Sequence, residues 1–362
     1  MNELMKKTTL YSMGFFVLSM CAIVYFSMTK TIEISNTAQD EIAKVSDSEY
    51  VDDNVSEDAV IKDDLDTSND IKPNELKFDK DKSNTDYLCI PLPLKTESTD
   101  ISIENHYMDH KLFIVINTED TSFYKETCLT GNRDLISEGT YEAKDSKIKI
   151  CFLMDGLYEY KTVLENGSLY ISFFKPREMF DRIVVIDPSC GGGDEGYKVD
   201  ELLEKNISLS VARELKSLFD ESDIKVYYTR MDDVNPSLES RVALANDTKA
   251  DMYVRIEADF NDDASVYGVT SYYNGDYFIP GFGNVELADL IEKEVVTMVK
   301  GKALGLKDAS MDDYTLIYSM VPSTTVKVGC MSNKQEAILL GREDYVKKIA
   351  QGIYNGIMKG YE

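Results

Sequence analysis

The residues best suited to chemistry lie in the second half of the chain, where polar side chains follow short apolar runs. Cys190 stands in the glycine-rich turn of the run RIVVIDPSCGGGDEG, which spans Arg182 to Gly196. Glu204 falls on the helix predicted after that turn, while Glu257 and Lys327 lie in two later strand-like segments. Thiolate and carboxylate groups can both bind zinc. The thiol of Cys190 and the carboxylates of Glu204 and Glu257 are thus of types that could bind a metal.

Hydrolysis at such a zinc would need more than ligands. Three protein ligands leave one position for a water molecule, whose pKa then falls to about 7. A nearby base must accept the proton of that water and return it to the leaving group. Both histidines of the chain, His106 and His110, lie upstream of these segments. Any chemistry here would have to proceed without imidazole.

The order and spacing of these segments resemble the zinc-dependent N-acetylmuramoyl-L-alanine amidases, which cut between the glycan and the stem peptide of bacterial peptidoglycan. The resemblance covers residues 182 to 362. It rests on the glycine turn and on further segments, which are Leu203-Glu204-Lys205-Asn206, Tyr228-Thr229-Arg230, Arg241 to Asn246, Arg255 to Asp259, and Thr324 to Asn333.

The resemblance implies which positions once held the metal. In the family the turn reads Asp-Pro-Gly-His-Gly-Gly and its His binds zinc, whereas here Ser189 and Cys190 replace the Gly-His pair. A family Glu on the first helix matches Glu204. The third ligand comes from a Ser-x-His-x-Asn strand, and Glu257 stands at the position of that His. One ligand of the three is thus retained.

The position of the family's general base is also changed. That Glu lies five residues after a proline, and counting from Pro322 reaches Lys327. We therefore predict a catalytically inactive site that binds no metal. The alternative is an altered zinc site formed by Cys190, Glu204 and Glu257, which would still lack a base at Lys327.

The substitutions are interpreted as compensatory. Residues two apart on a strand face the same way, so Arg255 and Glu257 should both point toward the former metal position. A buried carboxylate without a partner is costly, and Lys327 and Arg255 can supply the missing positive charge. The Lys327 ammonium should then lie within about 4 Å of a carboxylate oxygen, the distance of an ion pair. The alternative is that these side chains reach solvent and never meet.

The elements that must position these residues form an α/β pattern after Asp181. Residues 182–186, 225–229, 252–257, 269–273 and 324–328 read as strands, and residues 199–219, 238–246 and 286–299 read as helices. Two C-terminal helices follow, the first with a predicted capping box of Ser332 and Gln335. We expect a mostly parallel sheet flanked by helices on both faces, with the candidate site at strand ends.

Residues 87–181 are β-rich and predict a small antiparallel β-sandwich. Residues 101–105, 111–117, 147–153 and 168–174 read as strands with turn signals between them. The position is similar to that of the wall-targeting modules some of these amidases carry, although a spacer without a ligand is the alternative. Cys89, Cys128 and Cys151 lie here, so one disulfide and one free thiol are possible.

The N-terminus is interpreted as a membrane anchor followed by a linker. Lys6 and Lys7 precede an apolar run from Leu10 to Met28, long enough to cross a bilayer, and positive flanks stay in the cytoplasm. Residues 1–30 are the expected tip and anchor; a cleaved signal peptide and a lipoprotein signal at Cys21 are the alternatives. Between residues 40 and 86, sixteen acidic and six basic side chains predict an acidic, disordered linker, assigned to 31–86.

Together these features predict a single-pass cell-membrane protein with its C-terminal domains outside the cytoplasm. A net charge of −26 argues against nucleic acid as a partner. The leading hypothesis is an inactive amidase-like protein without a cofactor that binds peptidoglycan or regulates a cell-wall enzyme. The alternatives are an active amidase with an unusual zinc site and a structural partner in a division or sporulation assembly.

Overall fold

The computed structural model describes residues 74–79 and 85–362. These form two compact units that divide between Phe174 and Lys175, each with its own hydrophobic core. The expected anchor at 1–30 and most of the expected linker at 31–86 lie outside the described residues. The described residues 74–79 of that linker form two short strands, and Leu76 between them is buried in the core of the N-terminal unit. Within the described part of the chain, no helix is long and apolar enough to cross a membrane.

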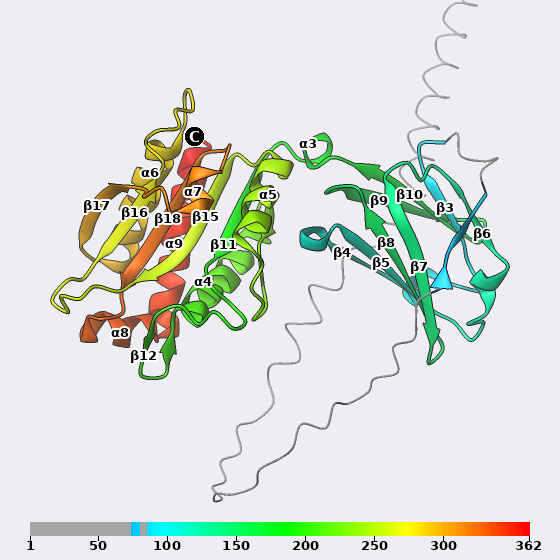
Figure 1. Cartoon of the computed structure of the whole chain (residues 1–362), viewed down its shortest axis with the longest axis horizontal. Coiled ribbons are helices and arrows are strands. Elements are labelled where there is room, and N and C mark those ends of the chain that lie inside the picture. Colours follow the sequence, from blue (N-terminus) through cyan, green and yellow to red (C-terminus); the bar gives the residue numbers. More distant parts are fainter. Residues whose placement is uncertain (1–73, 80–84) are drawn as a thin grey trace, which may run out of the picture. The chain divides into compact units, whose positions relative to one another are not determined.

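Two five-stranded sheets that share one core form the N-terminal unit (Figure 1). Every strand pair is antiparallel except β2 with β6. The first sheet has the order β1 (Asn74–Glu75), β7 (Ile136–Lys144), β8 (Lys147–Met154), β5 (Lys111–Asn117) and β4 (Ile101–His106). The second has the order β2 (Lys77–Phe78), β6 (Cys128–Gly131), β3 (Leu88–Pro91), β10 (Ser168–Phe174) and β9 (Glu159–Glu165).

The cysteines of this unit are all free, so the disulfide considered from the sequence is not present. Cys89 on β3 lies opposite Thr130 on β6, which makes Cys128 its diagonal neighbour. Diagonal neighbours are about 7–8 Å apart, beyond the usual Cα separation of a disulfide. Cys151 belongs to β8 in the other sheet.

A six-stranded sheet forms the centre of the C-terminal unit. Its order is β14 (Lys225–Tyr228), β11 (Ile183–Pro188), β15 (Met252–Asp259), β18 (Ser323–Cys330), β16 (Val269–Tyr273) and β17 (Ala303–Asp308). All neighbours are parallel except β16 and β18. The predicted mostly parallel sheet is therefore confirmed, and the pair β16–β17 runs in the reverse direction at one edge. The sequence analysis did not find β17.

Helices cover both faces of this sheet. Val184 and Ile186 share a core with α4 (Glu204–Phe219), α6 (Asn284–Val299) and α9 (Glu343–Gly360), which pack side by side (Figure 1). Val185 is equally buried but points to the other face, because side chains alternate along a strand. There α5 (Leu238–Thr248) contacts β11, and α7 (Tyr314–Ile317) contacts β18 and α5.

Two local predictions are corrected. The helix expected from Val199 begins at Glu204, because a hairpin of β12 (Lys198–Val199) and β13 (Leu202–Leu203) precedes it. The turn of that hairpin holds Asp200 at a φ of 53°, a left-handed conformation that a helix cannot include. Helix α8 (Lys334–Leu340) is capped by Asn333, whose side chain accepts hydrogen bonds from two backbone N–H groups, so Ser332 is not its cap.

Candidate functional site

The glycine turn after β11 brings the first two candidate ligands together. Cys190 adopts a left-handed φ of 60° in this turn. A side chain at Gly196 would place its Cβ 2.8 Å from the Cys190 Sγ and 2.5 Å from the Glu204 Oε2. The Cys190 thiol and the Glu204 carboxylate therefore both lie against the backbone of Gly196, which has no side chain. Burial raises the pKa of Cys190 to about 12, with the Glu204 charge adding to the effect, so the thiol is protonated at neutral pH.

Glu204 is buried at the first turn of α4 and is held by neutral donors. Its carboxylate accepts hydrogen bonds from the backbone N–H of Tyr197 at 3.0 Å and of Ala258 at 3.3 Å. The Ser189 hydroxyl donates to it at 3.3 Å. Burial raises the pKa of Glu204, and the Glu257 charge raises it further against the opposing effect of the backbone donors. No lysine or arginine within the described residues forms an ion pair with this carboxylate.

The third position lies on β15, in the middle of the sheet. In the strand register Asp187 of β11 is opposite Arg255, and Glu257 is opposite Lys327 of β18. Arg255 donates to the Glu257 Oε1 at 2.8 Å and to the Asp187 Oδ2 at 2.6 Å. Arg255 thus lies between two carboxylates and satisfies one oxygen of each.

Asp187 anchors the buried part of this network. Its carboxylate is fully buried and pairs with Arg241 as well as Arg255, while Thr229 and Tyr253 donate hydrogen bonds to it. Burial alone would raise the pKa of Asp187, but the two guanidinium groups hold it well below its usual range. Arg241 belongs to a segment that carries the family resemblance, but its pairing with Asp187 was not predicted from the sequence.

Lys327 extends from β18 into the same group of charges. Its ammonium lies 3.0 Å from the Asp259 Oδ1 and 3.9 Å from the Glu257 Oε2, and it rests over the ring of Tyr272. Burial would lower the pKa of Lys327, but Glu257 and Asp259 raise it above its ordinary value. The expected ion pair is therefore present, although the nearer partner is Asp259. Side chains alternate along a strand, so Asp259 points to the same face as Arg255 and Glu257. Asp259 was nevertheless not predicted as a site residue.

These residues do not fit a zinc ion. In the described part of the chain, no three His, Cys, Asp or Glu side chains are grouped so that they could hold a metal. Glu257 faces Arg255 and Lys327, and two cations beside a donor oppose the approach of a third. The Cys190 sulfur and the Glu204 carboxylate are neighbours, but Glu257, the third candidate donor, is already paired with Arg255 and Lys327.

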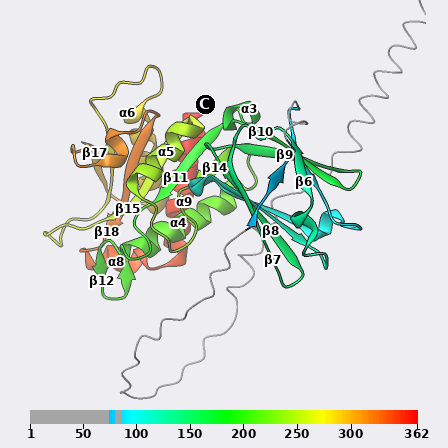
Figure 2. The ribbon, with the colours of Figure 1, turned by 45° about the vertical axis from the view of Figure 1, so that its right-hand side comes forward.

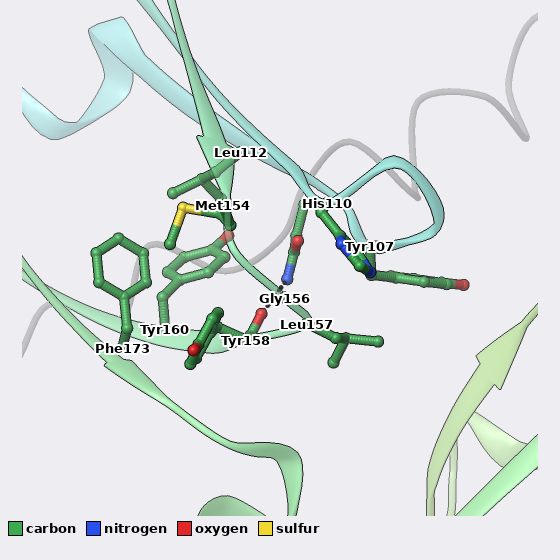
Figure 3. A pocket seen from close by; sticks show the side chains of 10 residues that line it. Tyr107, His110, Leu112, Met154, Gly156, Leu157, Tyr158, Tyr160 and Phe173 are labelled. Atoms are coloured by element: carbon green, nitrogen blue, oxygen red, sulfur yellow. Dashed lines mark hydrogen bonds between the residues drawn. The ribbon is translucent and has the colours of Figure 1, made fainter. Parts of the chain in front are cut away.

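One pocket of the N-terminal unit is very small. Figure 3 shows this pocket, lined by Tyr107, Met154, Tyr160 and Phe173, with the Asn105 amide donating to the Tyr158 carbonyl at 2.9 Å. Its volume is about 10 Å³, which is space for a single water molecule. It is too small for a glycan unit.

Comparison with known proteins finds relatives of the C-terminal half of the chain. Residues 184–359 match the family model described as N-acetylmuramoyl-L-alanine amidase. The uncharacterized protein YqiI of Bacillus subtilis is 33% identical over 181 residues, which span 50% of this chain and 85% of YqiI. The amidase LytC of the same organism is 30% identical over 178 residues, spanning 49% of this chain and 35% of LytC.

Solved structures of amidases also match the same half of the chain. The CwlD amidase from Clostridioides difficile, solved in complex with the GerS lipoprotein, is 27% identical, with a TM-score of 0.46 and coverage of 50% of this chain and 98% of that one. The catalytic domain of CwlV from Bacillus (Paenibacillus) polymyxa is 26% identical, with a TM-score of 0.46 and coverage of 49% and 97%. By its sequence this chain belongs to the N-acetylmuramoyl-L-alanine amidase family.

Proposed function

We propose that this protein is an inactive member of the amidase family that binds peptidoglycan, or a working cell-wall hydrolase, without cutting the wall itself. The observation that carries the proposal is the side chain at the position of the family's general base. Lys327 is held there by Asp259 and Glu257, with a raised pKa. A protonated ammonium cannot accept a proton from water, so the step that a base must perform has no residue to perform it.

The positive charges support the same proposal. With Arg255 and Lys327 in place of a divalent cation, Glu257 remains paired with positive charge. Random loss of the metal ligands would not by itself produce oppositely charged side chains that pair at these positions. In this interpretation the cleft remains a binding surface after the loss of metal chemistry.

The N-terminal features complete the proposal. The sequence of residues 1–30 suggests a membrane anchor, and the acidic sequence that follows suggests a linker up to about residue 73, because β1 and β2 already belong to the sheets of the N-terminal unit. This arrangement would place the β-sandwich and the amidase-like domain 182–362 outside the cytoplasm. In that arrangement the β-sandwich is a wall-targeting module or a spacer. A charge of −26 favours partners other than nucleic acid.

One observation favours a second candidate, an amidase with an altered zinc site. Cys190 and Glu204 converge beside Gly196 and supply two donors of types that zinc accepts. This candidate requires Glu257 to leave its cations. Zinc binding and bond cleavage distinguish it from the first candidate.

The decisive experiment measures zinc content and muropeptide release by the purified full-length protein, with an active family member as control. We expect well under one zinc per chain and no released stem peptides. One tightly bound zinc together with cleavage would establish the second candidate instead. Co-sedimentation with purified peptidoglycan tests the binding role, and a chain that neither cuts nor sediments would be assigned to protein partners alone.

A restored variant sharpens the test. Cys190→His, Glu257→His and Lys327→Glu together return the family's ligands and base. We expect this variant to bind zinc but to show little activity. Arg255 still lies beside the metal position, and the surrounding hydrogen bonds have changed. Full activity in the restored chain would show that the loss is confined to these three residues.

A further inference from the structure

A second surface lies at the end of the C-terminal unit opposite the candidate site. It is formed by two loops, residues 274–286 after β16 and residues 308–322 before β18, which we call the distal patch. Phe278, Met311 and Met320 are 83%, 76% and 64% exposed. Six large apolar side chains of the patch are exposed in all, namely Tyr277, Phe278, Val285, Met311, Tyr318 and Met320.

The sheet topology places both loops at one end. Because β16 runs antiparallel to β18, the last residues of β16 lie beside the first residues of β18, with Tyr272 opposite Thr325. The candidate site occupies the other end of the sheet, where β11, β15 and β18 finish. In both Figures 1 and 2 the loop after β16, drawn in yellow, lies at the far end of the unit from β12 and α8.

Buried asparagines hold the two loops together. The Asn274 amide donates to the Leu316 carbonyl at 3.2 Å, and the Asn284 amide donates to the carbonyls of Asn274 at 3.0 Å and Tyr277 at 3.1 Å. Both asparagines are buried. A loop that only closed a fold would be expected to turn its apolar side chains inward, yet this supported framework presents them to solvent.

The charged side chains within the two loops are all acidic. The two loops contain five acidic residues, Asp276, Glu286, Asp308, Asp312 and Asp313, and neither contains a lysine or an arginine. An anionic membrane surface would repel such a rim. A second copy of the chain meeting this patch about a twofold axis would bring the same acidic loops face to face.

From this combination we infer that the distal patch binds a protein segment with an apolar face flanked by lysine or arginine side chains, such as a basic amphipathic helix. The aromatic rings supply large rigid contacts, and the two methionines supply contacts that adapt to the partner's shape. The acidic rim pairs with the flanking cations and steers the encounter. The patch lies at the other end of the sheet from the candidate site, so a partner can bind here while the candidate site is occupied.

The test uses a synthetic amphipathic helix of about 18 residues built from leucine and lysine, and its leucine and glutamate counterpart. Binding of each to the purified full-length chain is followed by fluorescence anisotropy at low and high salt. The lysine peptide should bind, and its affinity should fall as the salt concentration rises. The glutamate peptide should not bind. The triple variant Phe278→Ser, Met311→Ser and Met320→Ser should lower the affinity for the lysine peptide by at least about tenfold.

A matched control separates the patch from general attraction to an acidic protein. Ile338 on α8 is 61% exposed at the opposite end of the unit, so Ile338→Ser removes a comparable apolar group and should leave binding unchanged. The single change Phe278→Ser, with an unchanged melting temperature, guards against a folding defect in the triple variant. Equal binding by wild type and triple variant would overturn the inference.

Two other occupants would also overturn it. If a second copy of the chain covered the patch, sedimentation would show self-association of the wild type and none of the triple variant. If the patch were a lipid contact, phosphatidylcholine vesicles would bind the wild type more tightly than the triple variant, beyond the binding that the proposed anchor at 1–30 gives to both. Neither behaviour is expected.

Discussion

At the position of the family's general base, Lys327 has become part of a row of alternating charges. Its ammonium contacts Asp259 and Glu257, and Arg255 continues the row to Asp187. Each carboxylate in this row has a cationic partner. The side chain of Lys327 is only 19% exposed, so its removal leaves charges that water cannot fully solvate.

Lys327→Met should lower the free energy of unfolding by about 2 kcal/mol, between the values typical of exposed and fully buried pairs. Denaturant unfolding measures the change. Lys307 provides the control, because it lies over the same Tyr272 ring but is exposed. Lys307→Met should change stability by less than about 0.5 kcal/mol. Equal effects of the two variants would show that the pairs of Lys327 contribute nothing.

Glu204 gives a prediction about pH. Burial raises its pKa, with Glu257 adding to the shift, so the folded protein keeps a proton that the unfolded chain releases above about pH 4.3. Its contribution to stability is therefore full below that value and is lost as pH rises through the folded pKa. Relative to wild type, Glu204→Gln should become more stable between about pH 4 and pH 8.

Thermal unfolding across this range tests the Glu204 prediction. Glu201→Gln, at an exposed position in the turn before α4, is the control and should follow the wild-type profile. Parallel profiles for Glu204→Gln and wild type would contradict the raised pKa.

At the scale of elements, the glycine turn after β11 is fixed by close backbone approach. Gly191 has a φ of 126°, and a Cβ there would lie 2.1 Å from the Val234 carbonyl oxygen. No L side chain fits this position, so the turn cannot be shifted without moving Cys190. The turn therefore survives the loss of the metal ligand that it carries in the family.

Gly191→Ala should destabilise the protein by more than about 2 kcal/mol, because both the backbone conformation and the contact are unfavourable. Gly193 in the same turn is the matched control, since nothing lies within 4 Å of a Cβ built on it. Gly193→Ala should be close to neutral in denaturant unfolding. Similar losses from both substitutions would mean that the turn as a whole, and not Gly191, is sensitive.

At the scale of the whole molecule, the described chain contains two cores that share no residue. Ile150 belongs to the core of the β-sandwich unit and Ile353 to the core of the amidase-like unit, and both are fully buried. Two separate cores predict two unfolding transitions.

Calorimetry of Ile150→Ala and Ile353→Ala tests this independence. Each change should cost about 2–5 kcal/mol, and each should lower the temperature of one transition only. A single transition that moves with both substitutions would show that the units unfold as one.

The sequence by itself determined the order of elements and the general location of the site. Apolar runs with a period of two or of 3.6 residues are local signals, and they identified β5, β10 and β11 as well as the buried stripe of α9. The resemblance to the amidase family grouped Cys190, Glu204, Glu257 and Lys327 as one candidate site, and the fold brings all four to the same end of the sheet. The weak signals were the short strands β3, β6 and β17 and the hairpin before Glu204.

Only the tertiary structure decided which charges meet. Lys327 pairs most closely with Asp259, and the register between β15 and β18 shifts between Glu257 and Asp259, which no local pattern encodes. The distal patch likewise joins two loops that are separated in sequence by α6 and β17. Such pairings depend on the register of strands that are distant in the chain, and a sequence read in local windows does not contain that information.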